Sequence, residues 1–189
     1  ELVQDTAWAG YEEVPQWIVE GYRTLLAEVD EVLGRQPDLV AVPVGVGSLA
    51  EAGIRHYRRT SPAPAVLSVE PVNAPSVIVS LEKGALTTVP TSYTIMAGLN
   101  CGTPSSNSWP YLQNGLDAAV TVSEDAASQA VQDLKQLGVD AGPCGASSLA
   151  GVRAVVADPL HRGALGLGEG AVVVLLSTES RAANPTAVA

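Results

Sequence analysis

The sequence predicts an α/β fold, in which a mostly parallel sheet carries helices on both faces. Apolar runs of strand length alternate with amphipathic runs of helix length along the chain. The strand-length runs are uniformly apolar, which is typical of strands that are covered on both sides. With 189 residues, 47% of them hydrophobic, the chain is long enough to bury one core. We therefore expect residues 1–189 to form a single α/β domain.

The first predicted element is a long amphipathic helix over residues 14–33. Pro15 suits its first turn, where a missing N–H costs nothing, and Gly34 suits a left-handed stop. A short apolar strand over 39–44 follows, and a turn then leads into a second helix over 49–59. The inward face of the first helix is expected to consist of Ile18, Tyr22, Leu25, Leu26, Val29 and Leu33.

The remaining predicted elements continue this alternation. Ser123 is expected to cap a helix that ends at Gly138. The inward stripe of that helix should consist of Ala127, Ala130, Val131, Leu134 and Leu137. We expect further strands at 65–70, 118–122 and 171–176, and further helices at 75–81, 92–98 and 147–157.

Charge and composition narrow the classes of partner. Twenty acidic residues against ten basic ones give a formal charge of −10, which repels phosphate backbones, so we expect no nucleic-acid partner. No apolar run approaches the roughly 20 residues that span a bilayer, so we expect no membrane partner. Two cysteines, Cys101 and Cys144, do not make a disulfide framework, and the default expectation is a reducing cytoplasm.

The glycine-rich turn at 45–48 is the strongest local signal of chemistry. Between a strand and a helix, the backbone N–H groups of such a turn point outward and can bind phosphate. One alternative is a tight turn without a ligand. Another is a NAD(P)-dependent Rossmann oxidoreductase, because Gly45-x-Gly47-x-x-Ala50 satisfies the dinucleotide fingerprint and Glu70 ends the next strand. Against that alternative, the fingerprint usually opens its domain, whereas here a long helix precedes it.

Several short segments have sequences distinctive enough to compare with a known family. In chain order they resemble segments of the diaminopropionate ammonia-lyases, and together they cover essentially the whole chain. The segments are Val3-Gln4-Asp5-Thr6-Ala7-Trp8-Ala9-Gly10-Tyr11, Pro15-x-Trp17-Ile18-x-x-Gly21-Tyr22, Gly45-Val46-Gly47-Ser48, Val69-Glu70-Pro71, Thr94-Ile95-Met96-Ala97-Gly98-Leu99-Asn100-Cys101-Gly102, Cys144-Gly145-Ala146 and Ser177-Thr178-Glu179.

The resemblance implies an enzyme of fold type II, similar to tryptophan synthase β, that uses pyridoxal 5'-phosphate. The family removes ammonia from a small amino-acid substrate, 2,3-diaminopropionate, and leaves pyruvate. The coenzyme performs the difficult chemistry, while the protein orients it and tunes its electronics. A homodimer is the expected assembly.

Site residues follow from the resemblance position by position. Asp5 matches an aspartate that is a candidate for proton transfer or for binding the substrate's cationic amine; its alternative role is that of a loop acid bonded to nearby N–H groups. Cys144 stands where the family usually has a serine facing the pyridine nitrogen, and Pro143 replaces a glutamate before it. The turn expected to hold the coenzyme phosphate consists of Gly45, Val46, Gly47, Ser48 and Leu49.

Three other groups of side chains receive structural assignments. Glu70 resembles the glutamate of a metal site in serine racemase-like relatives, but Ser76 stands where they carry an aspartate, so no metal is predicted. Cys101 is expected to pack in the core. His56 and His161 are expected on the surface or in loops.

The chain lacks one residue that such an enzyme needs. The family's Schiff-base lysine lies in an amino-terminal segment of Ser-x-Lys type, and the two lysines here, Lys83 and Lys135, stand outside that motif. We therefore expect the chain to be the carboxy-terminal part of a longer enzyme, inactive alone and paired with an amino-terminal fragment or a second copy. A non-catalytic partner subunit or a structural remnant is the alternative.

Overall fold

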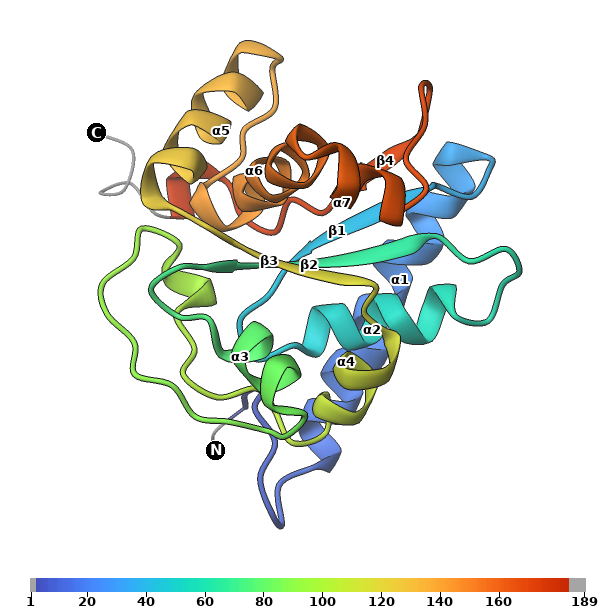
Figure 1. The fold of residues 1–189 in the computed structure, drawn as a ribbon. Coiled ribbons are helices and arrows are strands. Elements are labelled where there is room, and N and C mark those ends of the chain that lie inside the picture. The colour runs from blue at the N-terminus through green and yellow to red at the C-terminus, as the bar shows by residue number, and fades with distance from the viewer. Residues whose placement is uncertain (1–2, 184–189) are drawn as a thin grey trace.

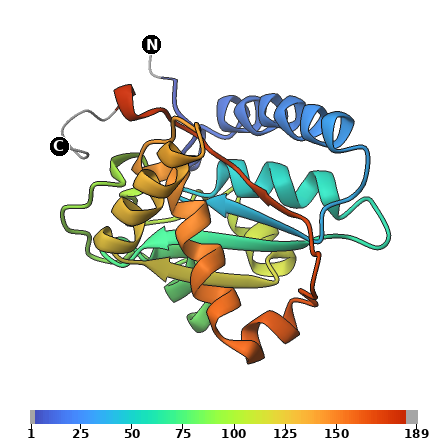
Figure 2. The same ribbon diagram turned by 90° about the horizontal axis from the view of Figure 1, so that it is seen from above.

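The computed structural model describes residues 3–183 and contains a sheet of four parallel strands in the order β3-β2-β1-β4 (Figure 1). All four strands were predicted. They are β1 (Leu39–Pro43), β2 (Ala65–Pro71), β3 (Ala118–Val122) and β4 (Val173–Leu175). Seen from above, β4 lies at one edge of the sheet (Figure 2).

Alternating residues of the strands face two separate cores. Leu39 and Ala41 of β1 pack in one core, with the helices that follow β3, whereas Val40 and Val42 pack in the other, with the first two helices. Parallel pairing keeps this alternation in register, because Leu39 lies opposite Ala65 on one side and opposite Val173 on the other. The predicted α/β class, with both faces of the sheet covered, is confirmed.

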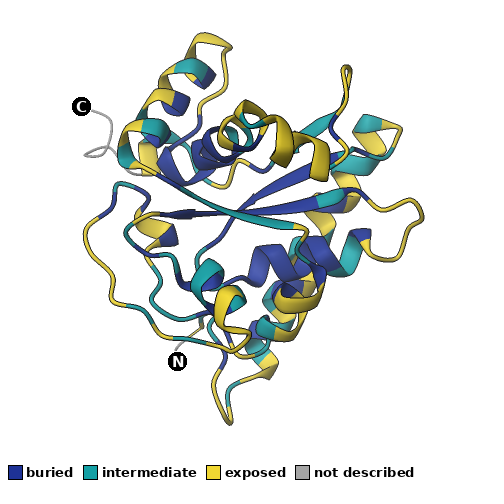
Figure 3. Ribbon diagram, viewed as in Figure 1, coloured by how far each residue is buried: buried dark blue, intermediate teal, exposed yellow. Residues whose placement is uncertain are grey.

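Helices cover both faces of the sheet (Figure 1), and the two central strands, β1 and β2, are almost entirely buried (Figure 3). On one face lie α1 (Glu13–Leu33), α2 (Ser48–Tyr57), α3 (Ser76–Lys83) and α4 (Trp109–Gly115). On the other lie α5 (Glu124–Gln136), α6 (Pro143–Ala157) and α7 (Pro159–Ala164). Two 3-10 turns cover Ala97–Leu99 and Arg181–Ala183. No helix within residues 3–183 is both long and apolar enough to cross a membrane.

Several sequence-based boundaries were wrong. The helix expected at 92–98 is only the 3-10 turn Ala97–Leu99, and α6 begins at Pro143 instead of Ser147. The helices α4 and α7 were not predicted, because each is too short to show a periodic apolar face. Leu25 and Leu137, which were expected to point inward, are exposed; the buried residues of α1 are Pro15, Val19 and Leu26.

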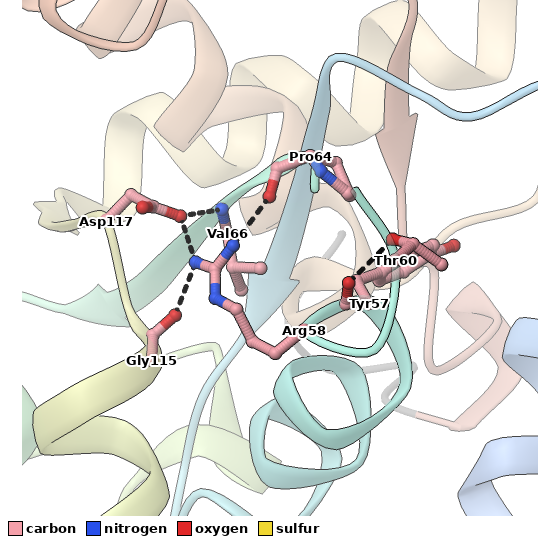
Figure 4. Close-up of polar contacts among 7 residues, drawn as sticks. All are labelled: Tyr57, Arg58, Thr60, Pro64, Val66, Gly115 and Asp117. Atoms are coloured by element: carbon pink, nitrogen blue, oxygen red, sulfur yellow. Dashed lines mark hydrogen bonds and ion pairs between the residues drawn. The ribbon is translucent and has the colours of Figure 1, made fainter. Parts of the chain in front are cut away.

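Arg58, at the carboxyl end of α2, forms hydrogen bonds with residues just before β2 and β3 (Figure 4). Its guanidinium donates to the carbonyl oxygens of Pro64 at 3.0 Å and Gly115 at 2.7 Å, and it pairs with Asp117. Asp117 in turn accepts a hydrogen bond from the amide of Val66 in β2 at 2.7 Å. These contacts fix the carboxyl end of α2 at the amino ends of β2 and β3. The amino end of α2 directly follows the glycine-rich turn in the sequence.

His56 is not a simple surface residue. Its Nε2 lies 2.7 Å from Asp30 Oδ2 of α1, and the hydroxyl of Tyr57 donates to the other carboxylate oxygen at 3.1 Å. The three side chains link α1 to α2. His161, by contrast, is exposed on α7, as expected.

Candidate functional site

The glycine-rich turn lies at the carboxyl end of β1 and leads directly into α2. Gly47 has a φ of 103°, and a Cβ atom there would lie 2.7 Å from Leu112 Cδ1 of α4. A Cβ atom at Gly45 would lie 3.0 Å from both Cys101 Sγ and the carbonyl oxygen of Gly98. Gly47 therefore disfavours a side chain by backbone conformation as well as by space, and at Gly45 a side chain would press on its neighbours.

The turn presents a row of free donors. No described residue accepts a hydrogen bond from the backbone amides of residues 45–50, and Ser48 starts α2. Amides without partners at a helix amino terminus, together with the helix dipole, form an anion-binding seat. The chemistry of this seat suits a phosphate group, because free N–H donors and the positive end of the α2 dipole both favour an anion.

Asp5 lies against this seat from another part of the chain. Its Oδ2 accepts a hydrogen bond of 2.5 Å from Ser48 Oγ, across 43 residues of sequence. Two residues on, the amide of Ala7 donates to Ser105 Oγ at 2.9 Å, and the amide of Ser105 donates to the carbonyl oxygen of Val46 at 2.8 Å. The alternative of a loop acid bonded to nearby N–H groups is therefore not what the structure shows.

The seat opens into a cavity of about 160 Å³. The cavity brings together Asp5 and all five residues predicted to hold a phosphate, residues 45–49. Sequence reasoning assigned no site role to the other lining residues, although most of them stand in the segments that carry the resemblance. These are Tyr22, Pro43, Gly98, Leu99, Cys101 and Thr178.

Cys101 therefore has more than the packing role that was expected of it. Its sulfur lies beside Gly45 on the cavity wall. Burial raises the pKa of its thiol, and the carboxyl groups of Asp5 and Glu70 add to this effect. The thiol consequently stays protonated and lines the cavity as a small, weakly polar group.

Cys144 does not line the cavity itself but lies next to a residue that does. It is buried in the first turn of α6, and its sulfur would lie 3.3 Å from a Cβ atom at Gly98, which does line the cavity. The carboxylate of Glu179 accepts a hydrogen bond from the Cys144 amide at 2.9 Å. Burial and, secondly, the adjacent Glu179 carboxylate together raise the pKa of the Cys144 thiol to about 12. Cys144 is thus a neutral thiol, and its predicted role toward a ring nitrogen stays a prediction.

Glu70 caps a helix. Its two carboxylate oxygens accept hydrogen bonds from the amides of Val77 at 2.7 Å and Ile78 at 2.9 Å in the first turn of α3. This arrangement counts against the ribose-binding role that the dinucleotide alternative gave to Glu70. Within residues 3–183, no group of three or more His, Cys, Asp or Glu side chains is placed to hold a metal ion.

Glu70 should give the protein a distinct pH dependence of stability. Burial raises its pKa to about 7, although the hydrogen bonds from α3 oppose the shift. A raised pKa means that the folded state binds the proton of Glu70 more tightly than the unfolded state does. The resulting contribution to stability is fully present below the unfolded pKa of about 4.3, and it is lost as the pH rises to 7. Relative to Glu70→Gln, the wild type should therefore lose on the order of 1–3 kcal/mol in free energy of unfolding between about pH 5 and 7.5.

Urea denaturation of both variants at the two pH values measures this difference. Glu82→Gln is the control, since Glu82 is an exposed residue of the same helix. A gap between wild type and Glu70→Gln that does not change with pH would contradict the assignment.

Neither lysine is near the cavity. Lys83 lies in the last turn of α3 and Lys135 in the last turn of α5, and both are exposed. The described residues that line the cavity include no lysine, arginine or histidine.

Comparison with known proteins agrees with this geometry. Residues 1–179 match the family described as pyridoxal-phosphate dependent enzymes. Diaminopropionate ammonia-lyase of Escherichia coli K12 is 35% identical over 194 residues, which cover 95% of this chain and 48% of that protein. L-threonine ammonia-lyase of Geobacter sulfurreducens is 33% identical over 103 residues, covering 53% of this chain and 26% of that protein.

Solved structures show the same likeness. The structure of the Escherichia coli diaminopropionate ammonia-lyase in complex with an aminoacrylate-PLP azomethine intermediate has a TM-score of 0.80 at 31% identity, covering 95% of this chain and 49% of that one. The match thus spans about half the length of the Escherichia coli diaminopropionate ammonia-lyase. The predicted fold type and the predicted coenzyme class are confirmed. Because the family match extends over residues 1–179, the chain belongs to the pyridoxal-phosphate dependent enzymes.

Proposed function

We propose that this chain binds the phosphate of pyridoxal 5'-phosphate and forms the carboxy-terminal half of a lyase that releases ammonia from 2,3-diaminopropionate. The observation that carries the proposal is the seat of free amides at residues 45–50, with the carboxylate of Asp5 beside it. The alignment with diaminopropionate ammonia-lyase over 95% of the chain supports this choice of substrate. Pyruvate and ammonia are the expected products.

The residues of this chain have separate tasks in the proposed reaction. The amides of the turn and Ser48 hold the phosphate, and Gly98, Leu99 and Cys101 form the facing walls of the cavity. When bound, the coenzyme supplies the electron sink that makes removal of an α-proton feasible. Asp5 is placed to bind a cationic amine or to move a proton at its carboxylate oxygens.

The lysine that such an enzyme needs has to come from a second segment of polypeptide. An exposed apolar surface on this chain supports the existence of such a partner. We call it the α1–β4 patch; its apolar residues are Leu25, Val29, Val32 and Leu33 of α1 and Val174 of β4, and Glu28 also lines it. Because β4 pairs with no strand of residues 3–183 other than β1, the patch borders an open sheet edge, which favours addition of another strand.

One experiment tests both the reaction and the partner. The chain is mixed with pyridoxal 5'-phosphate and the amino-terminal half of a diaminopropionate ammonia-lyase, and pyruvate formation from diaminopropionate is followed. We expect pyruvate from the mixture and none from either chain alone. Val32→Glu should lower the rate about tenfold, because a charge buried in the contact costs more than 1 kcal/mol.

The matched control is Leu160→Glu. Val32 is 89% exposed and Leu160 is 81% exposed, but Leu160 lies on α7, outside the patch. An equal effect of both substitutions would remove the patch from the proposal. Failure of the chain to bind pyridoxal 5'-phosphate, together with no pyruvate from the mixture, would overturn the proposed function.

A cytoplasmic location is part of the same proposal. Cys101 and Cys144 are both free thiols, which is the usual state in a reducing compartment.

A further inference from the structure

The cavity has an unusual charge for a site that binds an anion. Asp5 is the one carboxylic acid among the described residues that line it, and no lining residue is lysine, arginine or histidine. A phosphate seated here would be held by amides and hydroxyl groups alone, with a carboxylate beside it.

Asp5 lies at the seat itself. Ser48 Oγ, the side-chain donor of the first residue of α2, is bonded to Asp5 Oδ2 at 2.5 Å. The hydroxyl that would bind a phosphate oxygen therefore already binds a carboxylate. A carboxylate at a helix amino terminus gains the same stabilisation from the dipole as a phosphate does.

The fold keeps Asp5 in this place. Both backbone polar groups of Ala7 are hydrogen-bonded. Its amide donates to Ser105 Oγ, and its carbonyl oxygen accepts from Ser106 Oγ at 3.2 Å. Ser105 is bonded in turn to the carbonyl oxygen of Val46 in the turn. The segment that carries Asp5 and the seat thus form one hydrogen-bonded unit.

We propose that Asp5 is a specificity-determining residue of the phosphate site. Its carboxylate disfavours phosphate ligands that bring no positive charge, and it accepts ligands whose own cation offsets its charge. Two anions in so small a cavity repel each other strongly, whereas a ligand ammonium group restores the balance. The inference rests on the proposed function only in taking the seat as a phosphate site.

Two simple ligands separate this role from coenzyme binding. Inorganic phosphate brings no cation, and phosphoethanolamine brings an ammonium group. Calorimetric titration of the chain with each ligand should show that Asp5→Asn binds inorganic phosphate about tenfold more tightly than the wild type, with less than about a threefold change for phosphoethanolamine. Asp5→Glu, which keeps the charge, should retain the wild-type preference.

The control for net charge is Asp125→Asn, since Asp125 is an exposed acid in the first turn of α5, on the other face of the sheet. Equal gains for both ligands in Asp5→Asn, or an unchanged or weaker affinity for inorganic phosphate, would overturn the proposal. If the tenfold gain appears while no variant binds pyridoxal 5'-phosphate, the proposed function fails and the role of Asp5 stands.

Discussion

Replacing Gly47 by alanine should lower the affinity of the chain for pyridoxal 5'-phosphate by about a hundredfold or more. At a φ of 103° a side chain is strained, which costs on the order of 1–3 kcal/mol. The new methyl group would also lie 2.7 Å from Leu112 Cδ1 and 3.3 Å from Ser108 Cβ. The turn has to move to relieve these contacts, and the free amides then lose their common direction toward the phosphate. Titration followed by the absorbance of the coenzyme measures the loss.

Gly34→Ala is the matched control for this substitution. Gly34 also has a left-handed backbone, with a φ of 64°, but no atom lies within 4 Å of a Cβ atom placed there. It ends α1 and does not line the cavity. We expect Gly34→Ala to lower stability by about 1 kcal/mol and to leave coenzyme affinity unchanged. Wild-type affinity in Gly47→Ala would show that the turn is not the phosphate seat.

Gly151→Ala should lower the free energy of unfolding by about 2 kcal/mol, although alanine favours a helix. Gly151 lies where α6 crosses the sheet, and a Cβ atom there would be 2.4 Å from Val69 Cγ2 and 3.2 Å from Val120 Cγ1. Both valines belong to β-strands, so the helix has to move away from the sheet to make room. The midpoint of urea denaturation measures the effect.

A double mutant and a second glycine sharpen this test. Val69→Ala removes the atoms that clash, so the loss in the double mutant Val69→Ala/Gly151→Ala should be smaller than the sum of the two single losses. Gly163→Ala in α7 should instead stabilise the protein slightly, because nothing lies within 4 Å of a Cβ atom there. Additive losses in the double mutant would show that the contact with Val69 does not limit the packing of α6.

Features encoded by neighbours in the sequence were predictable. The apolar runs located all four strands, and Gly34 ends α1 in a left-handed conformation as expected. Ser123 caps α5 by accepting a hydrogen bond from the amide of Ala126 at 3.2 Å. The strand, the glycine-rich turn and the helix amino terminus around residues 45–49 were predicted because they follow one another directly, whereas phosphate binding by this turn stays a prediction. Short-range patterns of this kind depend only on backbone geometry and local periodicity.

Only the tertiary structure decided which distant segments meet at the cavity. The bond between Asp5 and Ser48 joins residues 43 positions apart, and Cys101 reaches the same wall from a loop beyond β2. The buried side of α1 matches its predicted apolar stripe only in part: Leu26 is buried as expected, but Leu25 is exposed and Val19 is buried instead. The physical reason is that these outcomes depend on which faces pack together, and that choice is made by contacts between segments far apart in the chain, which no local pattern records.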